Sequence, residues 1–342
     1  MSTELVPKKK QTKKIRVLSD YNVSVIPPPI GRANPGVYCF FNSLMSILYS
    51  CPIFIEKMLE AVKNEKSHGF CKSFIQEYNI VKEFKPCEVI TKSNLINHLM
   101  NGLKNSEETK DADYHKSIQE SDPIEGLDLM LNMLKKTNPE IYNIFNYRYR
   151  RIFTCDKCEQ ICHTKPIREL THRMFKIHPV DDGTNEEIFT YNLECYKSTF
   201  DDYACPICNG WKTSASDSDD TEHDTKNAIR TSGLTEDQLS IIPEVIGIQI
   251  NHTWNSQANT NVQKNQYFPM KLKFKKAKSN SYLHYKLIGQ IEQSGTSRGG
   301  HYWARCLRND GVYMINDSSV KKSKFECTPK TCYVMYHHYI PA

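Results

Sequence analysis

Residues 31–44 read GRANPGVYCFFNSL and form the most informative segment of the chain. From Cys39 to Ser50 the apolar residues recur at spacings of three and four, which predicts one buried helical face. Cys39 would lie at the N-terminus of this helix, where the partial positive charge of the helix end favours a thiolate. A lone cysteine is more often an ordinary buried residue, so a nucleophile needs support from elsewhere in the chain.

Four polar residues could assist Cys39. Asn34 lies upstream in an Asn-Pro-Gly turn, so its amide could point back to the helix start and stabilise an oxyanion. His301 follows two glycines, and Asn316 and Asp317 end the next apolar strand of a predicted hairpin. Because a cysteine nucleophile needs a base and the base needs an orienting partner, the order Cys, His, Asn/Asp indicates a papain-type arrangement.

Two Cys-x-x-Cys pairs predict a metal site: Cys155 with Cys158, and Cys205 with Cys208. A two-residue spacer lets both sulfurs of a pair reach one Zn²⁺ at about 2.3 Å, and two pairs complete a tetrahedral structural site. The long stretch between the pairs exceeds a compact zinc ribbon, so we expect each pair on its own hairpin. Free thiols are the alternative. Three further residues are alternate ligands by sequence distance: Cys162, His163 and Cys195.

Composition narrows the class of protein. The chain has 342 residues, 39% of them hydrophobic and 25% charged, enough for one large or two ordinary domains. It has 13 cysteines, an odd number, and shows no secretory signal, so we expect an intracellular protein with metal or thiol chemistry. We expect no membrane span, because no apolar stretch reaches about 20 residues. The net charge of +6 is partly due to one basic cluster, so no specific nucleic-acid binding is expected.

The sequence pattern changes along the chain, from a basic tail through helical segments to strand-like segments. Residues 1–30 are basic and contain three consecutive prolines, which predicts a flexible tail; the basic run fits either a nuclear address or none, so nucleus and cytoplasm both remain open. Helices are expected at about 70–84, 93–104 and 122–136, the last with Asp122 as its cap. Later segments such as 245–251 alternate like strands, and the acidic stretch 213–225 is predicted to be a solvated loop.

These motifs together resemble the catalytic domain of the ubiquitin-specific proteases (USPs), which are papain-like cysteine proteases. Residues 31–44 resemble the Cys box of the family, and residues 300–320 resemble its His box. Residues 121–127 are similar to its acidic helix start, and residues 242–250 to its strand after the zinc finger. The resemblance covers about residues 31–342, nearly the whole chain.

The resemblance implies an α+β, hand-like fold with three parts. A helical thumb is expected at about 31–148, zinc-bearing fingers at about 149–235 and an antiparallel-sheet palm at about 236–342. The implied cofactor is structural Zn²⁺, and the implied partners are ubiquitin and ubiquitinated proteins. We further expect a monomer.

The resemblance also implies the role of each site residue. Cys39 becomes the nucleophile, His301 the general base and Asn34 the oxyanion donor. The orienter of the histidine falls on Asn316, and Asp317 matches a following acidic residue that can also support catalysis.

The implied activity is hydrolysis of isopeptide or thioester-type bonds at the ubiquitin C-terminus. The chain departs from the family where Val37 and Tyr38 replace small polar residues and where Gly126 replaces a common Phe. Two alternatives therefore stay open. One is a catalytically weak or inactive ubiquitin-binding homologue, and the other is a protease for another ubiquitin-like modifier.

Overall fold

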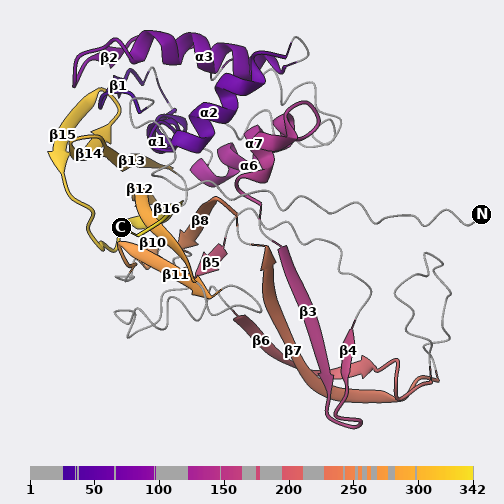
Figure 1. The fold of residues 1–342 in the computed structure, drawn as a ribbon. Coiled ribbons are helices and arrows are strands. Elements are labelled where there is room, and N and C mark those ends of the chain that lie inside the picture. The colour runs from indigo at the N-terminus through magenta and orange to yellow at the C-terminus, as the bar shows by residue number, and fades with distance from the viewer. Residues whose placement is uncertain are drawn as a thin grey trace, which may run out of the picture.

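The computed structural model describes residues 26–34, 36, 38–64, 67–95, 97, 122–146, 148–163, 175–177, 195–210, 227–241, 243–250, 253–255, 260–262, 268–275, 282–296 and 299–341. Within these ranges the helices gather at one end of the molecule, a large sheet lies in the middle, and a smaller sheet projects from the other end (Figure 1). The predicted α+β class is confirmed.

The described helices are α1 (Cys39–Leu48), α2 (Pro52–Ala61), α3 (Gly69–Val81), α6 (Pro123–Lys135) and α7 (Pro139–Asn143). A short parallel pair, β1 (Gly31–Arg32) and β2 (Val89–Ile90), lies beside them. The helices expected at 70–84 and 122–136 are confirmed as α3 and α6. Asp122 caps α6 as predicted, because its Oδ1 accepts a hydrogen bond from the amide of Ile124 at 2.8 Å. Of the helix expected at 93–104 the structure describes only residues 93–95 and 97, so this helix stays a prediction, and the acidic stretch 213–225 lies wholly outside the described residues.

The central sheet consists of β5 (Phe175–Ile177), β8 (Val245–Ile250), β11 (Lys271–Lys275), β12 (Tyr282–Thr296), β13 (Gly299–Arg308), β14 (Gly311–Asn316), β15 (Ser319–Ser323) and β16 (Thr331–Tyr339). Its order among the described strands is β15-β14-β13-β12-β16-β8-β5, and β11 pairs with β12 beside this path. Every pair is antiparallel except β5 with β8. The strand expected at 245–251 is confirmed as β8.

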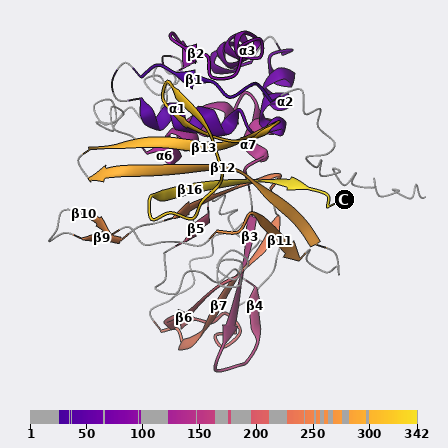
Figure 2. The same ribbon diagram turned by 90° about the vertical axis from the view of Figure 1, so that its left-hand side faces the viewer.

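Helix α1 packs directly on one face of this sheet, and α6 lies next to it (Figure 2). Gly289 in β12 makes the close approach possible, since a Cβ atom there would lie 2.6 Å from Cγ2 of Ile47. Arg308 of β13 fixes the far end of α1: its guanidinium donates to the carbonyl of Ser46 at 3.0 Å and to the hydroxyl of Ser50. A cation at a helix C-terminus is favourable, so this contact helps to hold α1 in place.

The opposite face of the sheet carries a second apolar cluster, which includes Phe268, Leu272 and Tyr336. The sheet is therefore covered on both faces over much of its width. Among the described residues no single helix is long and apolar enough to cross a membrane. Helices α1 and α2 meet such a criterion only as a pair, which is bent by 92°.

The projecting sheet is formed by β3 (Arg148–Cys155), β4 (Ile161–His163), β6 (Cys195–Ala204) and β7 (Arg230–Ile241). Its order is β4-β3-β7-β6 with antiparallel pairing throughout. Two small strands, β9 (Thr253–Asn255) and β10 (Thr260–Val262), form a separate hairpin. The projecting sheet lies where the sequence predicts the fingers (Figure 1).

The described chain starts inside the region expected to be a flexible tail. Residues 1–25 lie outside the description, but Pro27, Pro29 and Ile30 are buried. The carbonyl of Pro29 accepts a hydrogen bond from the amide of Cys87 at 2.7 Å. Within the described residues, packing thus includes residues before the expected boundary at Gly31, because this proline-rich segment packs onto the helical region.

Candidate active site and metal site

Cys39 is the first residue of α1 and is 8% exposed. Its Sγ lies 4.0 Å from the carbonyl oxygen of Gly300, which is the second residue of β13. The N-terminus of α1 therefore faces the start of β13, immediately beside His301. Cys39 and His301 belong to segments that are far apart in the sequence, and the fold brings these two segments together.

His301 and Asn316 form a close pair across the β13–β14 hairpin. Nε2 of His301 lies 2.6 Å from Oδ1 of Asn316. Because an amide oxygen can only accept, Nε2 carries the hydrogen and Nδ1 of a neutral imidazole keeps its lone pair. The imidazole is 42% exposed, so it remains open to a substrate. Asp317 is more distant, with Oδ2 3.9 Å from Nε2 of His301.

Asp317 instead binds the segment around Cys39. Its Oδ2 accepts a hydrogen bond from the side-chain amide of Asn34 at 3.0 Å, and its Oδ1 accepts one from the side-chain amide of Asn42 at 2.8 Å. Its main-chain oxygen accepts a hydrogen bond from the main-chain amide of Arg32 at 2.8 Å. The residue adopts a positive φ of 47°, which asparagine and aspartate tolerate better than most residues. Asp317 thus ties the end of β14 to both β1 and α1.

Sequence reasoning missed Asn42. The residue is 7% exposed and lies three positions after Cys39 on α1, so both side chains share one helix face. That spacing was the available signal. It did not show which carboxylate Asn42 would bind, because Asp317 is 275 positions away in the sequence.

Asn34 lies at the helix start, as the sequence predicts. Its Oδ1 accepts from the main-chain amides of Gly36 and Tyr38, each at 3.1 Å, which fixes the turn before Cys39. Its Nδ2 donates to Asp317, and an amide NH₂ has a second hydrogen that remains for another acceptor. The role of oxyanion donor stays a prediction.

A glycine allows β1 to lie against the turn that follows Asp317. A Cβ atom at Gly31 would lie 2.7 Å from the main-chain oxygen of Ser318, a distance that real side chains do not show. Only glycine fits at this contact without displacing the backbone. The first glycine of the informative segment therefore serves the junction between the two motifs.

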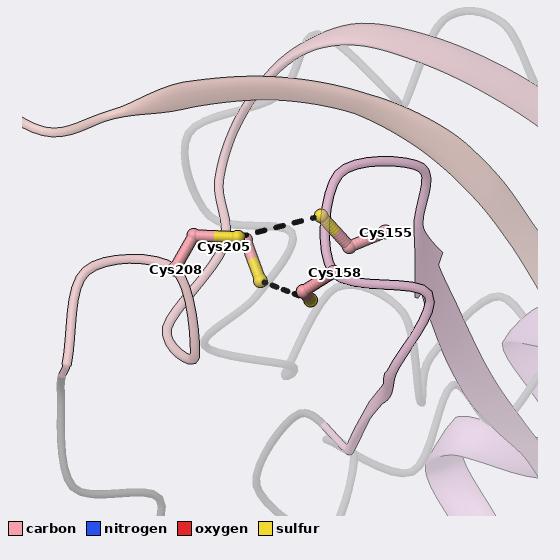
Figure 3. A group of neighbouring side chains, drawn as sticks. All are labelled: Cys155, Cys158, Cys205 and Cys208. Atoms are coloured by element: carbon pink, nitrogen blue, oxygen red, sulfur yellow. Dashed lines mark hydrogen bonds between the residues drawn. The ribbon is translucent and has the colours of Figure 1, made fainter.

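The four cysteines predicted as metal ligands form one cluster (Figure 3). Their sulfur atoms all lie within 4.8 Å of one another. The Sγ atoms of Cys155 and Cys208 are 3.8 Å apart, and those of Cys158 and Cys205 are 3.9 Å apart. A tetrahedral Zn²⁺ with Zn–S bonds of about 2.3 Å places its sulfur ligands about 3.8 Å apart. The donor set and its spacing therefore fit a four-coordinate zinc ion.

The charges of the cluster also favour a cation. Burial raises the pKa of the Cys155 thiol, but hydrogen bonds from Thr231 and from main-chain amides of its own turn lower that pKa to about 6. Desolvation raises the pKa of Cys208 to about 12, and the neighbouring thiols add to the shift. A second thiolate is therefore unfavourable beside the first unless a positive charge lies between them.

Each pair lies on its own hairpin, as predicted. Cys155 ends β3 and precedes β4, and Cys205 follows β6 and precedes β7. The turn after Cys158 has a positive φ at Glu159, and the turn after Cys208 has one at Gly210. The side chains of the three alternate ligands lie outside the description, which covers only the backbone of β4 and β6 there: Cys162, His163 and Cys195.

Residues 30–337 match the protein family described as ubiquitin carboxyl-terminal hydrolase. The chain belongs to this family. It is a USP-type deubiquitinase domain, a hydrolase of the cysteine protease class, and the predicted resemblance is confirmed. No curated protein matches the sequence at a significant level.

Solved structures of the SAGA DUB module share the fold. The module of Ubp8, Sgf11, Sus1 and Sgf73 bound to ubiquitin aldehyde matches with a TM-score of 0.67 and 16% identity over 94% of this chain and 71% of that chain. The module bound to monoubiquitin matches with a TM-score of 0.64 and 15% identity over the same shares, 94% and 71%. A yeast module with mutant Sgf73 gives 0.61 and 16% identity over 91% and 68%. The predicted USP hand is therefore confirmed as the fold of this family member.

Proposed function

We propose that this deubiquitinase domain hydrolyses isopeptide and thioester-type bonds at the C-terminus of ubiquitin, with Cys39 as nucleophile and His301 as general base. One observation carries the assignment: the 2.6 Å contact between His301 and Asn316 lies beside Cys39, whose Sγ is 4.0 Å from the oxygen of Gly300. The residues proposed as nucleophile, base and orienter come from α1, β13 and β14, and the contact of Cys39 with Gly300 brings α1 next to the residue that precedes His301. Such convergence is the arrangement that cysteine proteases require.

The proposed reaction begins when Nδ1 of His301 takes the proton of the Cys39 thiol. The thiolate attacks the carbonyl carbon of the last glycine of ubiquitin and forms a tetrahedral oxyanion. The free N–H of the Asn34 amide and the amides at the start of α1 are the available donors for this oxyanion. Protonated Nδ1 then gives its proton to the leaving lysine amine, and a thioester forms. Water, activated by the same nitrogen, hydrolyses the thioester and releases ubiquitin.

Ubiquitin is the proposed substrate because structures with this fold are bound to monoubiquitin and to ubiquitin aldehyde. Zn²⁺ is the proposed ion of the four-cysteine cluster. Bound there, it would supply the positive charge that stabilises several thiolates and would link the β3–β4 and β6–β7 hairpins. The cluster belongs to the projecting sheet and the catalytic residues to the helices and the central sheet, so the proposed role of zinc is structural.

Hydrolysis of ubiquitin that carries a C-terminal fluorogenic amide tests the assignment. We expect turnover by the wild type, none by Cys39→Ser, and a loss of about 10²–10⁴-fold in kcat for His301→Gln, since the base moves a proton in both steps. Cys87→Ser is the matched control, because Cys87 is an exposed cysteine outside the site. Turnover by Cys39→Ser at the wild-type rate would contradict the assignment.

A further inference from the structure

A pocket of about 450 Å³ lies on the face of the central sheet that is turned away from α1, beside the catalytic pair. Strands β12, β13 and β14 form its floor, and the segment before β16 forms its wall. The lining residues are Glu292, Trp303, Arg305, Met314, Asn316, Thr328, Pro329 and Lys330. None of the steps proposed above uses this pocket.

The charged groups at the floor of the pocket already bind one another. Glu292 accepts hydrogen bonds from Nε1 of Trp303 at 2.8 Å, from Nε of Arg305 at 2.7 Å and from the hydroxyl of Thr328 at 2.7 Å. Arg305 also pairs with Glu326 at 3.0 Å. With these partners satisfied, the lining of the pocket is mainly apolar, and Trp303, Met314 and Pro329 are among the residues that form it. Such a surface favours an apolar group.

The pocket is continuous with the catalytic pair. Asn316 lines the pocket and also accepts the hydrogen bond from Nε2 of His301. The ring of Trp303 stacks against the ring of His301, with centroids 6.1 Å apart and planes inclined by 27°. In the proposed reaction His301 gives a proton to the leaving lysine amine. The polypeptide that carries this lysine must therefore pass close to the imidazole, within reach of the pocket.

We propose that the pocket receives an apolar side chain of the polypeptide that carries the modified lysine, close to that lysine in sequence. This inference rests on the proposed function and adds a specificity determinant on the leaving-group side. Lys330 at the rim supports the choice, since its Nζ lies 5.5 Å above the Trp303 ring and would repel a basic residue. A neutral apolar side chain meets no such charge and gains contact with Trp303 and Met314.

Two conjugates test the inference. In each, ubiquitin is joined by an isopeptide bond to the lysine of a short peptide, and the residues on both sides of the lysine are Leu in one peptide and Ser in the other. For the wild type we expect kcat/KM to favour the Leu conjugate by roughly fivefold to tenfold, the effect of burying part of one apolar side chain.

The variants assign this preference to the pocket. Met314→Ser removes an apolar side chain from the floor of the pocket and should bring the ratio of the two kcat/KM values close to one, whereas Met314→Leu should keep the preference. Lys330→Ala removes the charge at an exposed rim position without risk to the sheet; it should keep the preference for Leu and raise kcat/KM for a third conjugate that has Arg beside the lysine. Ile80→Ser is the control, because it removes an exposed apolar side chain from α3 and should leave the ratio unchanged.

A wild type that cleaves both conjugates equally would overturn the inference, as would Met314→Ser with an undiminished preference. If no conjugate is cleaved, the proposed function fails. The pocket is then still tested by the dissociation constants of the two conjugates with Cys39→Ala. Tighter binding of the Leu conjugate to Cys39→Ala supports the pocket if the double variant Cys39→Ala/Met314→Ser loses this difference. Equal binding of the two conjugates to Cys39→Ala refutes the pocket.

Discussion

Asn316 and Asp317 are neighbours in sequence but bind different partners. Asn316 contacts the ring of His301 at 2.6 Å, whereas the carboxylate of Asp317 accepts from Asn34 at 3.0 Å and from Asn42 at 2.8 Å. The first residue can therefore orient His301, the proposed base, and the second joins the end of β14 to α1, which carries Cys39. This division makes the two residues separable by experiment.

A double-mutant cycle between Asp317 and Asn42 tests the second role. Asp317→Ala and Asn42→Ala remove the same hydrogen bond, so their effects on the free energy of unfolding should be non-additive by about 0.5–3 kcal/mol. Asn316→Ala, combined with Asn42→Ala, should be additive because the two residues share no bond. Urea unfolding of the single and double variants measures both couplings. Additive effects for Asp317 and Asn42 would mean that this contact does not stabilise the junction.

Asn316→Ala should act on catalysis more than on stability. Without its partner the imidazole loses its preferred orientation and tautomer, so kcat for a fluorogenic ubiquitin amide should fall by about 10–100-fold while KM changes little. Steady-state kinetics with the melting temperature of each variant separates the two effects. An unchanged kcat would contradict this role of Asn316 and would favour Asp317 as the residue that orients His301, since its Oδ2 lies 3.9 Å from Nε2 of His301.

For single residues, the sequence predicts which side chains are candidates for catalysis better than it predicts which side chains contact one another. Cys39, His301 and Asn316 could be selected because each stands in a local motif with a chemical reason. The bond between Asn42 and Asp317 could not be predicted, because it joins an α1 position to a turn after β14 through the tertiary fold alone.

A buried ion pair connects β1 to α3. Arg32 is 3% exposed and pairs with Glu77, whose carboxylate also accepts from the hydroxyl of Tyr49 at 2.9 Å and from Ser93. Since the next residues after Arg32 lead to Asn34 and the site, this pair anchors the segment that precedes Cys39. The sequence did not predict it, because a charged residue in so short a strand is ordinarily exposed.

Removing one member of this pair should be costly. Glu77→Ala leaves Arg32 buried without its partner, and we expect a loss of about 3–5 kcal/mol in the free energy of unfolding. Glu83→Ala is the control, since Glu83 is exposed and should change stability by less than about 0.5 kcal/mol. Equal unfolding midpoints in urea would show that the pair contributes nothing to stability.

The same pair predicts an acid-sensitive fold. Burial acts to raise the pKa of Glu77, but the charge and hydrogen bonds of Arg32, with those of Ser93 and Tyr49, hold it below its usual value. A carboxyl group with a lowered folded pKa stabilises the protein above its unfolded pKa of about 4.3, and this contribution is lost as pH falls through the folded pKa. Melting temperatures below pH 4 should therefore decline more steeply in the wild type than in Glu77→Gln. Parallel profiles would contradict this assignment.

We expect the packing of the β3–β4 and β6–β7 hairpins against each other to depend on the cysteine cluster. Cys205 is buried at the meeting point of both, so Cys205→Ser should abolish zinc binding and lower the melting temperature by more than about 5 °C. Cys327→Ser should do neither, because Cys327 is exposed and lies outside the cluster. Metal content by mass spectrometry and thermal melts check both variants. Equal melting temperatures of the two variants, with no zinc in the purified protein, would contradict the proposed metal site.

In the whole molecule the proposed catalytic residues lie where the helices meet the central sheet. Helix α1 supplies Cys39, the central sheet supplies His301 and Asn316, and the cysteine cluster lies in the projecting sheet. The order of helices, hairpin cysteines and terminal strands could be predicted from periodicity and motif spacing. The strand order of the central sheet could not, because each pairing, such as β16 between β12 and β8, is decided by contacts between distant segments.

The most direct test of the proposed catalytic site is reaction with ubiquitin that carries a C-terminal thiol-reactive group. The wild type should gain the mass of one ubiquitin, peptide mapping should place the adduct on Cys39, and Cys39→Ala should form none. Parallel probes built on other ubiquitin-like modifiers should react more slowly. An adduct on a different cysteine, or no adduct from folded, zinc-loaded protein, would contradict the proposed catalytic site.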